Sequence, residues 1–166
     1  GTGTGRMLEL LGARTQSAIG IDRSPEMLRF ARSRLAAAGQ RDASVARAEL
    51  RQGDMYALPL ADRSADVVLL HQVLHYAQQP AAAVAEAARL LGPGGRLLIA
   101  DFAPHDREDL RDQGAHARLG FSDQQVFEWF GAAGIEPERA DALEGGELTV
   151  KLWLGARPAD VVRKVA

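Results

Sequence analysis

The sequence predicts an α/β fold with a doubly wound, mostly parallel sheet that ends in an antiparallel hairpin. Three observations predict it. Short apolar runs alternate with helical segments along the chain, which is typical of parallel sheets. A glycine-rich loop occupies residues 1–5, and residues 147–155 alternate apolar and polar side chains after a Gly-Gly turn. We expect a single domain over residues 1–166.

Composition limits the classes of partner. The chain has 166 residues, of which 46% are hydrophobic and 25% charged, enough for one globular core. Its formal net charge of -2 lacks the basic excess that is typical of nucleic-acid-binding domains. Cysteine is absent, and no apolar run approaches the roughly 18 residues of a membrane span. We expect a cytoplasmic protein that contacts neither nucleic acid nor a membrane.

The first third of the chain predicts two strands flanked by helices. Ser24-Pro25 is a favourable helix start, because serine caps a helix and proline fits its first position. Apolar spacing carries this helix to Gly39. Residues 40–47 have no apolar period and are expected on the surface. The expected elements are a helix at 6–11, a strand at 17–22, this second helix, and a strand at 49–53.

The rest of the chain predicts further strands and helices. The nearly continuous apolar run 66–70 is typical of a buried parallel strand. Alanine-rich residues 80–91 predict a helix that Gly92-Pro93 stops. Ser122 and Gln125 match a capping box. The other expected elements are a strand at 96–102, a helix from 122 to 134, a strand from 135, and a last strand at 147–155.

The glycine-rich loop stands at the first residue of the chain. In an open α/β sheet such a loop follows a buried strand and lets the backbone approach a ligand closely. We therefore expect the first strand to be absent from this sequence, which is N-terminally truncated. Because that strand would pair with two neighbours, the chain is expected to aggregate or to form a homodimer that supplies a strand.

An acidic residue at the end of the next apolar run points to a ribose-containing cofactor. Asp22 lies nineteen positions after Gly3, where a carboxylate is placed to accept hydrogen bonds from a ribose diol. A dinucleotide loop requires a third glycine, but Arg6 or Leu8 occupies that position, depending on which glycine is counted first. The pattern disfavours an NAD-dependent enzyme, which stays open as a third hypothesis.

Four motifs carry a family resemblance. Gly1 to Arg6, Gly20-Ile21-Asp22, Gly53-Asp54-Met55 and Gly92-Pro93-Gly94-Gly95 resemble the successive motifs of class I S-adenosylmethionine-dependent methyltransferases. Residues 53–76 resemble the ubiquinone and menaquinone C-methyltransferases. The whole chain is similar to the catalytic half of proteins fused to an ArsR-like regulator. The resemblance implies a Rossmann-like fold, S-adenosylmethionine as cofactor and a small-molecule methyl acceptor.

The resemblance also implies roles for particular residues. The glycine loop would hold the methionine carboxylate, Asp22 the ribose, and Asp54 the adenine amino group. Met27 would lie against the adenine face or, alternatively, belong to the core, and Asp54 could instead serve only its own turn. His71, at the end of a strand, would offer its backbone to the methionine amino group. The predicted cofactor-binding residues are Gly1, Thr2, Gly3, Asp22, Arg23, Met27, Asp54, Met55 and His71.

Catalysis requires a general base only where the acceptor must lose a proton. His75 is the predicted base, with His71, Tyr76 and His105 as the other candidates, although a lone histidine is often structural. Residues 105–118 form an insertion that is either a solvated helix or a lid over the acceptor. As a lid, its histidines His105 and His116, together with Phe121, would shape the acceptor pocket. The two histidines together with Asp101 and Asp106 could suggest a metal site, but their spacing matches no metal motif, and no metal is expected.

Two functional classes follow. The first is methyl transfer from S-adenosylmethionine to a small molecule by in-line displacement. The second is a non-catalytic sensor, in which a fused winged-helix regulator responds to S-adenosylmethionine or its demethylated product. Turnover on an acceptor would favour the first class, and tight cofactor binding without turnover would favour the second.

Overall fold

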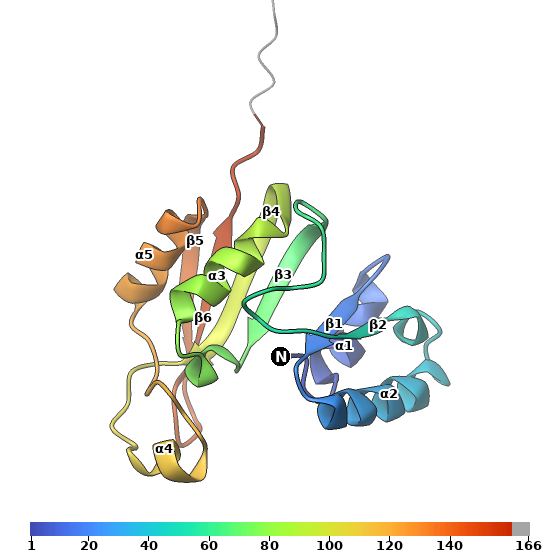
Figure 1. Ribbon diagram of the computed structural model, residues 1–166, viewed down its shortest axis with the longest axis horizontal. Coiled ribbons are helices and arrows are strands. Elements are labelled where there is room, and N and C mark those ends of the chain that lie inside the picture. Colours follow the sequence, from blue (N-terminus) through green and yellow to red (C-terminus); the bar gives the residue numbers. More distant parts are fainter. Residues whose placement is uncertain (161–166) are drawn as a thin grey trace, which may run out of the picture. The chain divides into compact units, whose positions relative to one another are not determined.

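The computed structural model describes residues 1–160, in which the chain forms two compact units (Figure 1). The first unit is Gly1–Pro59, and the second begins at Leu60. The predicted α/β class, the parallel strand pairs and the antiparallel final hairpin are confirmed. The described strands form a two-stranded sheet in the first unit and a four-stranded sheet in the second.

The first unit is a pair of parallel strands with two helices. Strand β1 (Ile19–Asp22) pairs with β2 (Glu49–Gln52) in register from Ile19 opposite Glu49 to Asp22 opposite Gln52. Helix α1 (Arg6–Leu11) follows the glycine loop, and α2 (Pro25–Gly39) follows β1. Both strands therefore end at the same edge, where Asp22 and the segment after Gln52 lie.

Helix α2 begins and ends as its sequence predicts. The Ser24 Oγ accepts a hydrogen bond from Met27 N at 3.2 Å, and Pro25 occupies the first position. Its apolar stripe packs inward, with Leu28, Ala31, Leu35 and Ala38 buried. The hydrogen bond to the Ser24 cap fixes Met27 in the first turn of α2, just after Asp22.

One residue of the first unit differs from expectation. Residues 40–47 were expected on the surface, but Val45 is buried and packs with Leu35 and Ala38. The single apolar side chain in a polar stretch has no period to reveal it, and a short 3-10 turn (Val45–Arg47) directs it inward. This contact closes the far end of α2.

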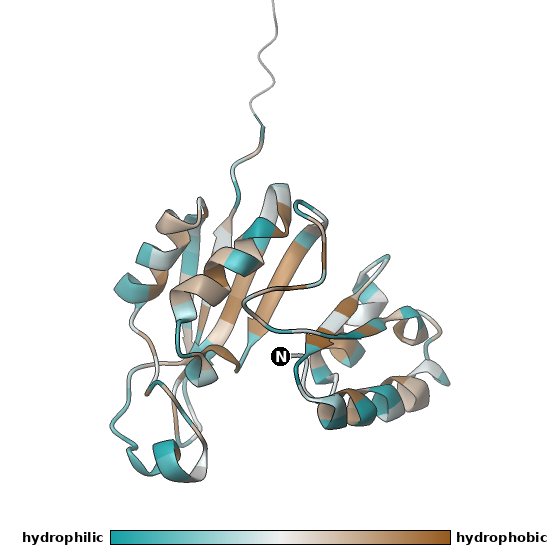
Figure 2. Cartoon of the chain, viewed as in Figure 1, coloured by the Kyte–Doolittle hydropathy of each residue, from teal (hydrophilic) through white to brown (hydrophobic). Residues whose placement is uncertain are grey.

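The second unit is a four-stranded sheet in the order β3-β4-β6-β5 (Figure 1). Strands β3 (Ala65–His71) and β4 (Leu91–Phe102) are parallel, whereas β6 (Val150–Ala156) is antiparallel to both β4 and β5 (Glu136–Leu143). Strand β3 is hydrophobic over most of its length, and β4 over part of its length (Figure 2). Their carboxyl ends, at His71 and Phe102, therefore meet at one edge of the sheet.

Two helices pack on this sheet and close the core. Helices α3 (Pro80–Arg89) and α5 (Asp123–Ala132) contact each other and the strands (Figure 1). The insertion contains only the short helix α4 (Asp109–Gln113). Ser122 caps α5 as predicted, because its Oγ accepts a hydrogen bond from Gln125 N at 3.2 Å. The largest fully buried side chains of this unit are Trp153, Phe121, Phe130, Leu74, Leu91, Leu97, Ile99 and Ile135.

The predicted end of α3 and start of β4 were misplaced. The helix ends at Arg89, and β4 begins at Leu91, so that Gly92-Pro93 belongs to a strand rather than to a helix stop. The physical reason is distant pairing: Gly94 N donates to Arg157 O, and Arg157 N donates to Gly95 O. A partner more than sixty residues away thus holds this glycine segment, in which Gly94 has a φ of 74°.

One strand is less covered than its sequence suggests. Val67 of β3 is 63% exposed, although an apolar run of this kind predicts burial. Within residues 1–160, β3 has β4 as its only strand partner, and β1 has only β2. The expectation that a further strand pairs with both stays a prediction. None of the helices described is long and apolar enough to cross a bilayer.

Candidate functional site

The glycine loop of the first unit is a tight turn beside the end of β1. Thr2 N donates to Ile21 O at 2.7 Å, and Gly5 N donates to Thr2 O at 3.0 Å. Gly3 and Gly5 both adopt positive φ, at 53° and 77°. A Cβ on Gly5 would lie 3.1 Å from the Ala31 Cβ, so glycine here permits α1 and α2 to pack closely.

Asp22 ties the loop to the start of α2. Its Oδ2 accepts a hydrogen bond from Gly3 N at 2.8 Å, and its Oδ1 accepts one from Ser24 N at 2.9 Å. The side chain is half-buried. Each oxygen keeps a further lone pair, since an ionised carboxylate offers about four acceptor sites. Asp22 can therefore hold the loop and still accept hydrogen bonds from a ligand.

The loop offers fewer free donors than the sequence suggested. We expected the N–H groups of Thr2 and Gly3 to be available to a carboxylate, but both donate within the unit, to Ile21 O and to Asp22. These two hydrogen bonds hold the loop against the end of β1. At Gly3, however, no atom lies within 4 Å of the position that a Cβ would take. The loop backbone is therefore open to a ligand at this residue.

The other predicted residues of the first unit lie near the ends of β1 and β2. Met27 is half-buried, and Arg23 is exposed with its carbonyl accepting from Gln52 Nε2 at 3.2 Å. Asp54 is exposed, and its Oδ1 accepts a hydrogen bond from Tyr56 N at 3.0 Å, which closes a turn. The turn alternative for Asp54 is therefore realised, while one carboxylate oxygen remains for other partners. Met55 is half-buried in the same turn.

In the second unit, His75 forms a buried pair with an acid that sequence reasoning did not assign. The His75 Nδ1 lies 2.7 Å from Asp101 Oδ1, and both side chains are almost completely buried. Asp101 also accepts hydrogen bonds from the backbone N–H groups of Leu74, His75 and Phe102. The sequence feature that could have indicated this role is that Asp101 is a lone acidic residue within the apolar run 97–102. Four donors make Asp101 a fixed support for the imidazole.

The pair lies within a cluster of rings. His116 stacks on Phe102 with ring centroids 5.7 Å apart and planes inclined by 16°, and its ring lies 4.3 Å from that of His75. Tyr76 and His105 border the same cluster, at 5.6 and 6.4 Å from His116. Burial lowers the pKa of both His105 and His116, and proximity to His75 lowers both further. We name His75, Tyr76, Phe102, His105 and His116 the ring cluster.

The insertion is fastened over His75. Ala117 N and Arg118 N both donate to the carbonyl oxygen of His75, at 2.8 and 3.0 Å, and an Arg118 guanidinium nitrogen donates to Gln78 O at 2.7 Å. His105 N donates to Leu119 O at 3.1 Å. The sequence could not decide between a solvated helix and a cover, but these bonds place residues 116–118 against the His75 segment.

Two further predicted residues of the second unit lie outside the ring cluster. His71 is half-buried at the last position of β3, where Gln72 follows with a positive φ of 47°. Phe121 is buried against Trp129 in an edge-on contact with centroids 5.3 Å apart, so it belongs to the core rather than to the ring cluster. Among the residues that the structure describes, no group of three or more acidic or histidine side chains suits a metal ion.

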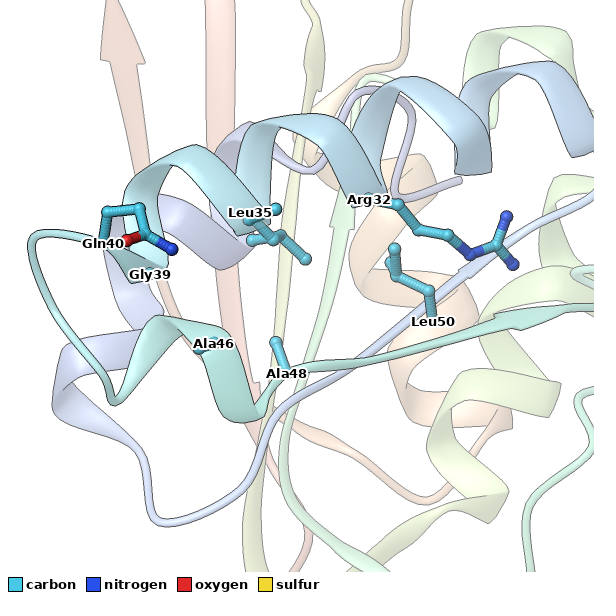
Figure 3. A pocket seen from close by; sticks show the side chains of 8 residues that line it. Arg32, Leu35, Gly39, Gln40, Ala46, Ala48 and Leu50 are labelled. Atoms are coloured by element: carbon cyan, nitrogen blue, oxygen red, sulfur yellow. The ribbon is translucent and has the colours of Figure 1, made fainter.

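An open hollow of about 460 Å³ lies in the first unit between α2 and β2 (Figure 3). Leu35 and Leu50 form its apolar wall and Arg32 its polar border. None of the predicted cofactor-binding residues lines this hollow, so it is separate from the glycine loop and Asp22.

Comparison with known proteins assigns the family. Residues 1–99 match the model of the methyltransferase domain family. A malonyl-[acyl-carrier protein] O-methyltransferase of Methylococcus capsulatus is 31% identical over 150 residues, which cover 86% of this chain and 52% of that protein. The chain spans about half or less of the curated relatives it matches.

Solved structures share the fold at low identity. A S-adenosylmethionine-dependent methyltransferase of Methanosarcina mazei superposes with a TM-score of 0.79 at 16% identity, covering 96% of this chain and 91% of that one. A [4+2]-cyclase, SpnF, superposes with a TM-score of 0.76 at 17% identity, covering 96% and 74%. These likenesses confirm the Rossmann-like fold, which serves more than one reaction. With the glycine loop, the strand-end acid and the family model in agreement, the chain belongs to the methyltransferase domain family.

Proposed function

We propose that this chain is a S-adenosylmethionine-dependent methyltransferase that transfers a methyl group to a small-molecule acceptor by in-line displacement. The observation that carries the proposal is the 2.8 Å hydrogen bond from Gly3 N to Asp22 Oδ2, which joins the glycine loop to the strand-end acid. In a chain of this family, that arrangement supports a cofactor with a ribose and an amino-acid end.

The residues of the first unit fit this cofactor. Asp22 keeps acceptor capacity for ribose hydroxyls, and the backbone at Gly3 is open. We assign Gly1, Thr2 and Gly3 to the methionine end, Arg23 and Met27 to the ribose and adenine, and Asp54 with Met55 to the adenine ring. The role of His71 toward the methionine amino group stays a prediction from the resemblance. When bound, the cofactor supplies a methyl group on a sulfonium sulfur, which is already activated for displacement.

His75 is the proposed general base for an acceptor that must lose a proton. Because the Asp101 carboxylate accepts from Nδ1, the neutral ring carries its lone pair on Nε2, where a proton can be taken up. The remaining catalytic contribution is positioning, on the order of 7 to 11 kcal/mol in favourable cases. His75 is covered by residues 116–118, so we further propose that the 105–118 insertion is a lid that opens to admit the acceptor.

A calorimetric titration tests the cofactor class. We expect S-adenosylhomocysteine to bind the full chain and NAD to bind far more weakly. Asp22→Asn should weaken binding at least about tenfold, because a hydrogen bond to a charged group contributes roughly 1.5–3 kcal/mol. Asp42→Asn is the matched control, since Asp42 is exposed and its carboxylate accepts hydrogen bonds from Ser44 in its own turn. If S-adenosylhomocysteine does not bind, or if NAD binds more tightly than S-adenosylhomocysteine, the proposal is overturned.

Turnover tests the base. S-adenosylhomocysteine release is measured over a panel of hydroxyl, carboxyl and amine acceptors. We expect His75→Gln to lower kcat by about 10² to 10⁴, the usual contribution of a general base, with cofactor affinity unchanged. An unchanged kcat rejects the base assignment. Cofactor binding without turnover across the panel would instead support the sensor hypothesis.

A further inference from the structure

We propose that His105 and His116 determine acceptor specificity, and that they select a planar ring compound with an uncharged hydroxyl group over a protonated amine. This inference rests on the proposed function and adds the acceptor class. It assigns the two histidines to recognition of the acceptor, whereas His75 remains the base.

Two buried ring nitrogens without a partner are the first observation. Among the residues described, the buried side-chain nitrogen and oxygen atoms that lack a hydrogen-bond partner are His105 Nε2, His116 Nδ1 and Arg157 Nε. Two of these three belong to the ring cluster. A buried polar atom without a partner is unfavourable, and a ligand that supplies the missing hydrogen bond would remove this penalty. His116 is itself only 9% exposed.

The hydrogen-bonding character of these atoms can be assigned in part. The His105 Nδ1 accepts a hydrogen bond from Arg107 N at 3.3 Å, so the proton of the neutral ring lies on Nε2, which is a donor. His116 Nδ1 can act as an acceptor in one tautomer of its ring. A hydroxyl group both accepts and donates, and one such group can bond to both histidines. An ammonium group has only donors and would leave the His105 N–H unpaired.

The charges around the ring cluster also favour an uncharged hydroxyl compound over a protonated amine. Asp101 is the acid inside it, and four donors already occupy its oxygens. Of the acids near His105, Asp109 is bound by the guanidinium of Arg107 at 2.8 Å, and Asp106 is exposed. A protonated amine would therefore enter a buried site without a free carboxylate, which is unfavourable. An uncharged hydroxyl compound does not carry this penalty.

The shape of the cluster favours a planar ligand. Phe102 and His116 are nearly parallel, and Tyr76, which is 48% exposed, stands edge-on to His116. Phe102 and His116 stack on each other, whereas the exposed ring of Tyr76 leaves an aromatic surface on which a flat ligand can pack. The rings thus hold a planar body while the histidine nitrogens hold its hydroxyl.

A matched pair of probes tests the inference on the full chain saturated with S-adenosylhomocysteine. We expect 2-naphthol to bind at least tenfold more tightly than 2-(aminomethyl)naphthalene, which is protonated at pH 7.5. His105→Phe and His116→Phe keep a ring but lose the nitrogens, and each should weaken 2-naphthol binding at least tenfold. Gln125→Ala, on the exposed face of α5, is the control.

The outcomes separate this inference from the proposed function. Failure to bind S-adenosylhomocysteine rejects the function itself. Cofactor binding with equal affinity for both probes, or with no loss in either variant, rejects only the inference. If a variant fails to fold, the imidazole nitrogen chemical shifts of the unmodified chain, measured by NMR, test the inference instead. Adding 2-naphthol should move the His105 and His116 signals. Unmoved signals would contradict the inference.

Discussion

The two units hold an aspartate near the carboxyl end of a strand in opposite ways. Asp22 of the first unit is half-buried and accepts two backbone hydrogen bonds, one on each oxygen. Asp101 of the second unit is fully buried and accepts four, three from backbone N–H groups and one from His75. Since a carboxylate has about four acceptor sites, Asp22 retains capacity for a ligand and Asp101 does not.

The cores of the two units also differ, in the size of their buried side chains. The buried residues of the first unit are small or aliphatic, such as Leu28, Ala31 and Val45. The second unit buries Trp153, Phe121 and Phe130, which contribute much larger apolar areas. We infer that the first unit offers an accessible, lightly packed acid, whereas the second holds its acid rigidly as a support for His75.

The largest expected effect is the loss of Asp101. Asp101→Ala leaves the His75 ring and three backbone N–H groups without their acceptor, and removing one partner from a buried pair costs about 3–5 kcal/mol. Urea unfolding measures this loss in the free energy of unfolding. Asp66→Ala, at an exposed position of β3, should change stability by no more than about 0.5 kcal/mol. Equal effects of the two substitutions would show that Asp101 is not the support we describe.

The next largest effect on stability is expected in the turn that leads into α5. Gly120 has a φ of 81°, and a Cβ there would clash with the carbonyl oxygen of Ala103. Gly120→Ala should destabilise by roughly 2–5 kcal/mol, from left-handed strain together with overpacking. Gly134 has a φ of 71° and open space, so Gly134→Ala should cost only about 1–2 kcal/mol. Chemical denaturation of both variants gives the difference, and a reversed order contradicts the prediction.

The comparison also explains what the sequence could reveal. The serine caps of α2 and α5 and the position of Asp22 are local signals, and all three were predicted correctly. The pairing of His75 with Asp101 joins residues 26 positions apart on different segments, so no local pattern contains it. The start of β4 was hidden for the same reason, because Leu91 pairs with Ala65 and the following glycines bond to Arg157, both distant in the sequence. What depended on distant partners could not be predicted.

Acid should destabilise the second unit before the first, because the two histidines whose pKa is lowered, His105 and His116, lie in the second unit. Burial lowers the pKa of His105 and His116 below the value of about 6.5 that they regain on unfolding. The unfolded chain therefore binds more protons, and stability falls as the pH drops from about 7 toward 5.

Urea midpoints at pH 7.5 and 5.5, followed by hydrogen exchange in each unit, measure this effect. Stability should fall in the second unit, and the double substitution His105→Gln, His116→Gln should reduce its pH dependence. Most carboxylates titrate below this range. A first unit that loses stability equally in this window would refute the assignment to the histidines.

The smallest effects come from the two helix caps, which give the same local chemistry in different units. Ser24→Ala and Ser122→Ala each remove one hydrogen bond of 3.2 Å at a helix start and should each cost about 1 kcal/mol. Ser33→Ala, inside α2 and exposed, is the control, because alanine is the better helix former. If the first unit is the less stable, Ser24→Ala will speed hydrogen exchange in α2 while leaving that in α5 unchanged. Equal acceleration of both helices by Ser24→Ala would mean that the units unfold together, and the contrast between Asp22 and Asp101 would then be local in origin.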